Sequence, residues 1–224
     1  MLKFFKKISD YSYVLSFDIA KKVSGYSLYD IDNDCVVLAG IVDTSKHSED
    51  FIWDYFYNQI IKIIDKCKEL VGPENEAAIF VTKERLPSQN GRFSTIETLQ
   101  GLAQAHAVFD LAVCHSCTEV YDYEGIHATS VKAYFKKLIN CEKPQKEDIA
   151  NYLQRLYPNF DFSKYPFDVT DSLGVTLTLL GKKWDSDIIE KVRELKKERK
   201  SAKTKAKITK LESEIEALEA LKIR

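Results

Sequence analysis

Four acidic residues stand where a charged side chain is unexpected, and together they could do chemistry. Asp18 lies inside an apolar run, and Glu84 follows another one. Asp168 and Asp171 are three residues apart at the start of an apolar, helix-like segment, so they share one helix face. Carboxylates that converge repel one another, and divalent cations are the usual compensation. The pattern therefore predicts a two-metal site that hydrolyses phosphodiesters.

Some of these acids also have a purely structural interpretation. Asp168 begins the helix-like segment, where an acid caps the helix and suits its dipole. Glu84 has Lys83 and Arg85 beside it as possible surface partners. Asp171 lies a turn deeper, where capping explains it poorly. We favour the metal role, and for Asp168 both interpretations stay open.

Length and composition are those of an ordinary cytosolic protein. With 224 residues, 45% of them hydrophobic and 30% charged, the chain can form one well-buried domain plus an appendage. No stretch reaches the roughly 18 apolar residues that cross a bilayer, so no membrane partner is expected. Residues 1–7 are basic but lack the apolar region of a secretory signal. We therefore expect a cytoplasmic protein.

The five cysteines are an odd set in a chain too large to need disulfides, so reduced thiols are expected. Cys114 and Cys117 have the spacing of metal ligands, but no second pair completes a zinc site. We favour a buried strand edge there over a metal or redox role. His106 and His127 are expected to be packing or capping residues.

Charge is unevenly distributed along the chain. The net charge is −1, yet Lys182 to Lys210 contains 12 Lys and Arg against 5 Asp and Glu. Such a basic segment suits a polyanion, although a solvated helix face explains it almost as well.

The remaining patterns predict the elements that position these residues. Three early strands joined by short turns indicate an antiparallel meander. Later strands alternate with helices, which favours a mixed α/β sheet with helices on both faces. The expected strands are Tyr13–Ala20, Gly25–Asp30, Cys35–Val42, the run before Glu84 and Cys117–Tyr121. The expected helices span about 49–70, 94–113, 127–138, 146–157 and 167–180.

From Asp185 onward the chain contains no Gly or Pro, and its composition is typical of long helices. Apolar residues recur at 3-4-3 spacing in two series that are out of register across Ser201–Thr204. We expect either a helical hairpin or one long helix with a register break. Its apolar face must be buried on its own domain or on a second chain, and helix contact is favoured over a direct DNA role. The expected domains are 1–183 and a helical extension, 184–224.

Several segments together resemble a known family when they are taken in order. They are 18–27, 79–84, 99–105, 128–132, 142–146 and 168–173. In this order, from about residue 13 to 182, they resemble RuvC-type Holliday-junction resolvases of the RNase H-like superfamily. The resemblance implies an α/β fold with an RNase H-like, mixed five-stranded sheet flanked by helices.

The resemblance also implies roles for individual residues. Asp18 would bridge two Mg²⁺ ions, Glu84 would hold one ion, and Asp171 with Asp168 would hold the other; Mn²⁺ is an expected substitute. The basic residues that would contact DNA phosphates are Lys132, Lys143, Lys146 and Arg92.

The function that we expect is Mg²⁺-dependent resolution of four-way DNA junctions by paired symmetric nicks. Two symmetric cuts need two active sites, so a twofold homodimer on branched DNA is expected. The resemblance suggests a bacterial, phage or viral source. Two alternatives stay open: an RNase H-like nuclease that acts on flaps or RNA–DNA hybrids, and a non-catalytic junction-binding scaffold.

Overall fold

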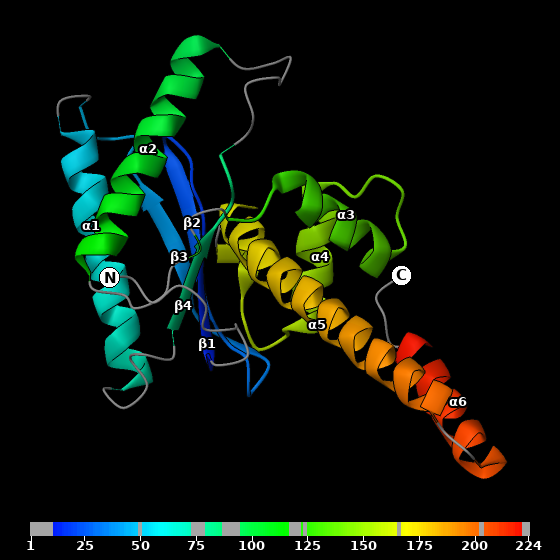
Figure 1. Ribbon diagram of the computed structural model, residues 1–224. Helices are drawn as coiled ribbons and strands as arrows, with labels where there is room; N and C mark the ends of the chain where they lie inside the picture. Colours follow the sequence, from blue (N-terminus) through cyan, green and yellow to red (C-terminus); the bar gives the residue numbers. More distant parts are fainter. Residues whose placement is uncertain are drawn as a thin grey trace. The chain divides into compact units, whose positions relative to one another are not determined.

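A four-stranded mixed sheet forms the centre of the computed structural model (Figure 1). Its order is β3-β2-β1-β4, with β1, β2 and β3 antiparallel and β4 parallel to β1. The strands are β1 Tyr13–Asp18, β2 Val23–Asp30, β3 Cys35–Asp43 and β4 Ile79–Lys83. The structure describes residues 11–48, 51–72, 79–86, 95–116, 122, 125–164, 167–201 and 204–220. The meander and the mixed sheet predicted from the sequence are confirmed.

The fifth predicted strand, Cys117–Tyr121, lies outside the described residues. Glu84, the residue directly after β4, forms a single parallel bridge with Ile126. The end of β4 is therefore tied to the segment that leads into the helix beginning at Ala128.

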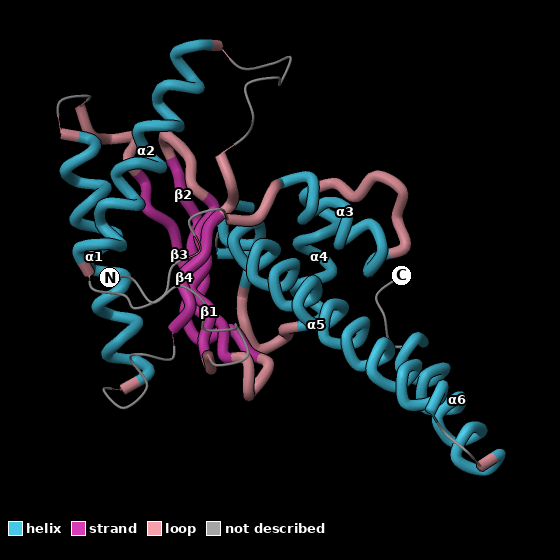
Figure 2. Tube along the Cα trace, viewed as in Figure 1, coloured by secondary structure: helices cyan, strands magenta, loops and turns pink. Residues whose placement is uncertain are grey.

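Helices cover both faces of the sheet (Figures 1 and 2). The helix positions predicted from periodicity are confirmed to within a few residues, except for the end of α5. The helices are α1 Ile52–Val71, α2 Ile96–His115, α3 Ala128–Ile139, α4 Lys146–Leu156, α5 Phe167–Ser201 and α6 Lys205–Ala220, with a 3₁₀ turn at Phe162–Lys164. None of the described helices is both long enough and apolar enough to cross a membrane.

The main core lies between the sheet and the pair α1 and α2. Leu15 and Phe17 of β1 point to this side and pack with Phe56 of α1 and Phe109 of α2. The rings of Phe17 and Phe109 meet edge to face, 4.7 Å between centroids. Because side chains alternate along a strand, Asp18 lies on the opposite face from Phe17.

The opposite face of β1 is joined to the first turns of α5 by buried hydroxyl groups. Ser16 Oγ donates a hydrogen bond to the carbonyl oxygen of Ser172 over 2.7 Å, and Thr176 Oγ1 donates to Ser16 Oγ over 2.6 Å. Ser16 Oγ also lies 2.9 Å from Ser27 Oγ of β2. These bonds fix the position of α5 on the sheet at Ser16, which is two residues before Asp18.

Helix α5 does not end near Leu180 as predicted, but continues to Ser201. Gly181 is the weakest helix former on this stretch, and no Gly or Pro follows it before Ser201. By its internal contacts the chain divides into two compact units, Met1–Leu177 and Thr178–Arg224, and the division falls within α5. The domain boundary between residues 183 and 184 remains our proposal.

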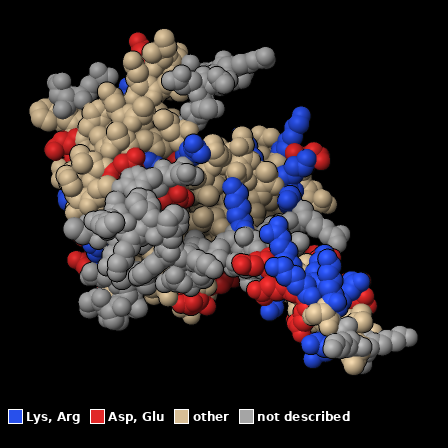
Figure 3. Space-filling model, in the orientation of Figure 1, with Lys and Arg blue, Asp and Glu red and all other residues tan. Residues whose placement is uncertain are grey.

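The second unit contains a helical hairpin, which is one of the two arrangements predicted from its apolar spacing. Ile188, Val192 and Leu195 of α5 form a buried cluster with Leu211 and Ile215 of α6. Ion pairs flank this cluster, and they are Lys196–Glu219 at 2.8 Å, Lys207–Glu198 at 2.9 Å and Arg199–Glu212 at 3.3 Å. On the face drawn in Figure 3, basic and acidic side chains gather along this hairpin. The two helices thus bury their apolar faces on each other.

Candidate active site

Asp18 ends β1, and a glycine on the neighbouring strand brings α5 close to it. The Cα of Asp18 pairs with that of Gly25 in β2. A Cβ atom on Gly25 would lie 2.0 Å from the carbonyl oxygen of Asp168 and 2.8 Å from the amide nitrogen of Val169. Only glycine therefore allows the first turn of α5 to cross the sheet here. This close approach brings the helix of Asp168 and Asp171 beside Asp18.

Glu84 is brought to the same edge of the sheet by parallel pairing. Phe17 of β1 pairs with Lys83 of β4, and the amide nitrogen of Glu84 donates a 2.8 Å hydrogen bond to the carbonyl oxygen of Phe17. Neighbouring strands lie about 4.8 Å apart. The residues that follow this pair, Asp18 and Glu84, are therefore adjacent at the carboxyl ends of the two strands.

Three of the four predicted acids line one cavity of about 260 Å³, and they are Asp18, Glu84 and Asp171. Lys132 of α3 and Lys146 of α4 line it as well. The structure thus brings together most of the predicted site from five separate elements. Asp168 does not line the cavity, but its charge acts on Asp18.

The cavity holds its carboxylates in an unfavourable electrostatic environment. Burial raises the pKa of Asp18 well above its usual range, and the charges of Glu84, Asp171 and Asp168 raise it further, against the lowering effect of Lys146. Burial, and then the charge of Asp171, raises the pKa of Glu84 to about 7. Each carboxylate therefore makes ionisation of the next one harder, which is the situation that a bound cation relieves.

Asp171 already has a cationic partner. Burial raises the pKa of Asp171, while the hydrogen bond and charge of Lys146 oppose that rise. Lys146 donates this hydrogen bond from its ammonium group to the Asp171 carboxylate. Burial lowers the pKa of Lys146, but its bond to Asp171 and the nearby carboxylates outweigh burial and leave the pKa raised. Lys146 thus neutralises part of the acidic cluster.

The chemistry of the donor set fits Mg²⁺. Carboxylate oxygens are the ligands that hard divalent cations prefer. The Asp18 and Glu84 carboxylates accept no hydrogen bond from, and form no ion pair with, any residue that the structure describes. However, no three His, Cys, Asp or Glu side chains within the described ranges are gathered closely enough to hold a metal ion. The donors share a cavity without yet forming a coordination shell.

The other predicted site residues are more scattered. Lys143 is exposed and does not line the cavity. Arg92 and Cys117 lie outside the described residues. Cys114 is exposed near the end of α2 and not at a buried strand edge, so that expectation was wrong: the helix continues past it to His115.

One feature of the site was missed by the sequence analysis, which is the pairing of Lys146 with Asp171. Lys146 is the first residue of α4, and the backbone amide of Gln145 before it donates a 2.9 Å hydrogen bond to the Asp148 side chain. The signal in the sequence was therefore a helix start, Gln145 to Asp148, preceded by Pro144. This signal predicted that Lys146 begins a helix, but it did not predict that Lys146 contacts Asp171 of α5.

Comparison with known proteins supports the fold but not a family by sequence. No protein-family model and no curated protein matches the chain. Solved structures that are similar include RuvC of T. thermophilus in complex with a Holliday junction substrate, with a TM-score of 0.54 and 14% identity over 74% of this chain and 91% of that one. They also include Thermus thermophilus RuvC, with a TM-score of 0.52 and 13% identity over 74% of this chain and 92% of that one. The chain therefore has the RuvC-like, RNase H-like fold that the sequence predicted.

Proposed function

We propose that this chain is a divalent-metal-dependent endonuclease that resolves four-way DNA junctions. The observation that carries the proposal is the cavity in which Asp18, Glu84 and Asp171 meet at one edge of a RuvC-like sheet, with Lys132 and Lys146 on its walls. One of the similar structures is RuvC bound to a Holliday junction substrate, which supports branched DNA as the partner.

The acidic residues are the proposed metal ligands. Asp18, Glu84 and Asp171, with Asp168 from the adjacent turn, would hold Mg²⁺, and Mn²⁺ would substitute. When bound, Mg²⁺ supplies Lewis-acid activation of the attacking water and neutralises charge on the scissile phosphate and the leaving 3′-oxygen. The protein contributes the fixed positions of the carboxylates, which β1, β4 and α5 hold in place.

The lysines are the proposed phosphate contacts. Lys132 and Lys146 face the same cavity as the acids, so a phosphate entering it meets both. Lys146 bonds Asp171 in the absence of DNA and can turn to a phosphate oxygen when one arrives. Lys143 and Arg92 would contact phosphates farther along the strand. Binding of this kind weakens as salt rises.

Paired symmetric nicks require two copies of the site, so we propose that the active form is a twofold homodimer. A nuclease that acts on flaps or RNA–DNA hybrids would need the same acids, and a binding scaffold would need none of them. The retention of all four acids favours an enzyme over a scaffold.

A cleavage panel tests the proposal. The protein is incubated with a synthetic four-way junction, a flap, a linear duplex and an RNA–DNA hybrid, each with Mg²⁺ or with EDTA. We expect paired nicks at symmetric positions of the junction, with Mg²⁺ only. If the flap or the hybrid is cut as well as the junction or better, the proposal is wrong and the alternative nuclease activity is supported. If the junction is bound but nothing is cut, the scaffold role is supported instead.

A further inference from the structure

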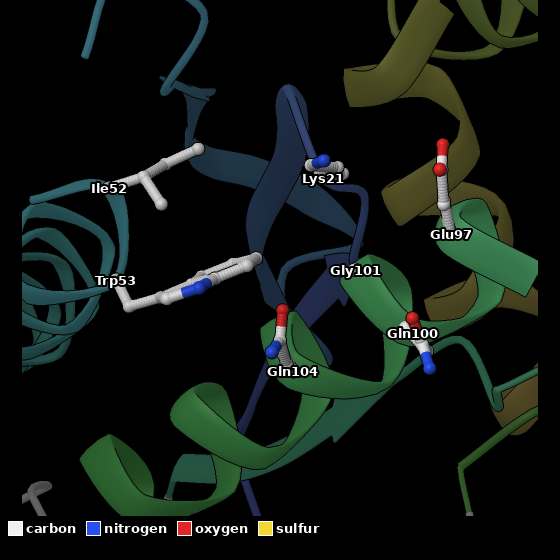
Figure 4. Close-up of a pocket in the computed structure, with 7 residues that line it drawn as sticks. All are labelled: Lys21, Ile52, Trp53, Glu97, Gln100, Gly101 and Gln104. Carbon is white, nitrogen blue, oxygen red and sulfur yellow. The ribbon is translucent and has the colours of Figure 1, made fainter. Parts of the chain in front are cut away.

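A second and larger cavity lies on the α1–α2 side of the first unit, and the proposed chemistry does not use it (Figure 4). It has a volume of about 520 Å³, which is within the range of about 300–1,000 Å³ for small-molecule sites. We call it the Trp53 pocket. Its principal lining residues are Lys21, Trp53, Glu97, Gln100, Gly101 and Gln104.

Core packing and hydrogen bonds hold the walls of the Trp53 pocket in place. Trp53 packs against the main core with part of its surface exposed. The turn that bears Lys21 is anchored by Thr44, whose Oγ1 donates to the carbonyl oxygen of Lys21 over 2.8 Å and whose amide donates to that of Lys22 over 2.8 Å. The third wall is one face of α2, capped by Thr95. The pocket therefore exists before any ligand enters.

A glycine makes room for the lysine. A Cβ atom on Gly101 would lie 2.8 Å from Cδ of Lys21. The stem of Lys21 thus lies directly on α2, and its ammonium group is brought to the same cavity as the Trp53 indole on α1 (Figure 4). The aromatic ring and the cation come from segments that are more than thirty residues apart.

The chemistry of the lining matches a nucleobase better than a phosphate. Gln100 and Gln104 each offer an amide donor and acceptor, and paired amide contacts recognise base edges. The Trp53 indole offers a flat surface on which a base can stack. Glu97 would repel a phosphate but can accept a hydrogen bond from an exocyclic amino group. Lys21 is the only cation among the described residues of the lining, and it can meet the phosphate attached to the base.

The Trp53 pocket is close to the proposed catalytic residues along the chain. Lys21 is three residues after Asp18, so their Cα atoms are at most about 11 Å apart. We propose that the pocket binds one unpaired nucleobase of the DNA strand whose phosphate enters the Asp18 cavity. This inference rests on the proposed nuclease function. It makes the pocket the source of a base preference close to the cut.

Fluorescence of 2-aminopurine tests the inference without requiring cleavage. Junctions that carry one 2-aminopurine at each position around the crossover are titrated with the full chain in EDTA. We expect quenching at one position on each cut strand, because the base stacks on the Trp53 indole. Trp53→Leu should abolish that quenching and weaken binding roughly tenfold, and Trp53→Phe should retain much of both.

Two further variants separate a local effect from a folding or charge effect. Gln104 is exposed, so Gln104→Leu should leave the thermal unfolding curve unchanged but reduce quenching and alter the preferred base. Lys21→Gln should weaken binding more than Lys22→Gln, which removes the same charge from the adjacent exposed residue outside the pocket.

Three results would overturn the inference. If the wild type binds and cuts junctions but no position is quenched, the base pocket is wrong and the nuclease stands. If free deoxynucleoside monophosphates bind the pocket as tightly as the junction does, the pocket serves a free nucleotide instead of the strand. If the wild type neither binds nor cuts junctions, the proposed function fails and the inference fails with it.

Discussion

Asp18 carries a charge that the fold tolerates poorly. It is partly buried, and three other carboxylates act on it. Such a group lowers the stability of the folded protein in order to serve the site. Its neighbour Lys146 partly offsets this, because it bonds Asp171 in the same cavity. Substitution of an acid in the site should therefore raise stability and lower activity.

Asp18→Asn should abolish cleavage, keep junction binding and raise stability. The folded-state pKa of Asp18 is raised, so its charged form destabilises the fold at high pH, and that penalty disappears as the pH falls through the folded-state pKa. In EDTA at pH 8 we expect a gain of about 1 kcal/mol or more, or about 2–4 °C in Tm. Circular dichroism melts at pH 8 and pH 4 measure it. A gain that is equal at both pH values would contradict the electrostatic explanation.

Lys146→Gln should reduce cleavage and junction affinity more than Lys143→Gln. The two lysines are close in sequence, but only Lys146 lines the cavity and bonds Asp171. Loss of one phosphate contact should lower the slope of log affinity against log salt by about 1. Fluorescence anisotropy at several salt concentrations measures the slope. Equal effects of the two substitutions would show that Lys146 acts only as general surface charge.

His106 should make the fold sensitive to acid. Burial, and then the charge of Lys83, lowers its pKa to about 4, against the raising effect of Asp110. The unfolded chain therefore binds a proton more readily, and stability falls as the pH drops from about 6.5 to 4, by up to about 3 kcal/mol. In urea unfolding, the free energy of unfolding should depend less on pH over this range for His106→Phe than for the exposed control His47→Gln. Parallel curves for both variants and the wild type would refute this role.

At the scale of elements, the site depends on how closely α5 lies on the sheet. The approach is set by Gly25 and by the hydroxyl bonds between Ser16 and α5. The proposed catalytic acids thus come from strand ends and from a helix whose position on the sheet is set by neighbouring polar groups. A small shift of α5 would separate Asp171 from Asp18.

Gly25→Ala should therefore be severely destabilising. The new Cβ would lie 2.0 Å from a backbone oxygen of α5, which cannot move alone. We expect a loss of more than about 3 kcal/mol in urea unfolding, with loss of cleavage in whatever protein folds. Gly174→Ala is the matched control. Gly174 lies on α5 itself, and the atoms nearest to a Cβ added there are side-chain carbons at 3.2 and 3.3 Å. A Gly25 variant as stable as the Gly174 variant would show that α5 can move away freely.

The elements were largely predictable from sequence, whereas their contacts were not. Alternation and helical spacing are local properties, so the meander β1–β3 and the position of α1 were predicted correctly. The end of α5 was missed because the apolar pattern stops near Leu180 and the charged segment after it was treated as a separate helix, although the helix runs through both. The bond from Lys146 to Asp171 and the Trp53 pocket join distant segments, and no local pattern encodes such a contact.

At the scale of the whole molecule, the chain divides into a unit that contains the site and a unit that contains the hairpin. The acids, the lysines of the cavity and the Trp53 pocket all belong to Met1–Leu177. The hairpin buries its apolar residues within itself, so it has no remaining need of a second chain to cover that cluster. The proposed dimerisation must therefore be explained by other surfaces.

The central claim is that distant carboxylates meet at one site for divalent cations, and iron-mediated cleavage of the protein tests it most directly. Fe²⁺ replaces Mg²⁺ in oxygen-ligand sites, and with ascorbate and peroxide it cuts the backbone next to itself. We predict fragments that end near residues 18, 84 and 168–171, suppressed by excess Mg²⁺ and absent in Asp18→Asn. Cuts at only one of these segments, or cuts that persist in Asp18→Asn, would contradict the account.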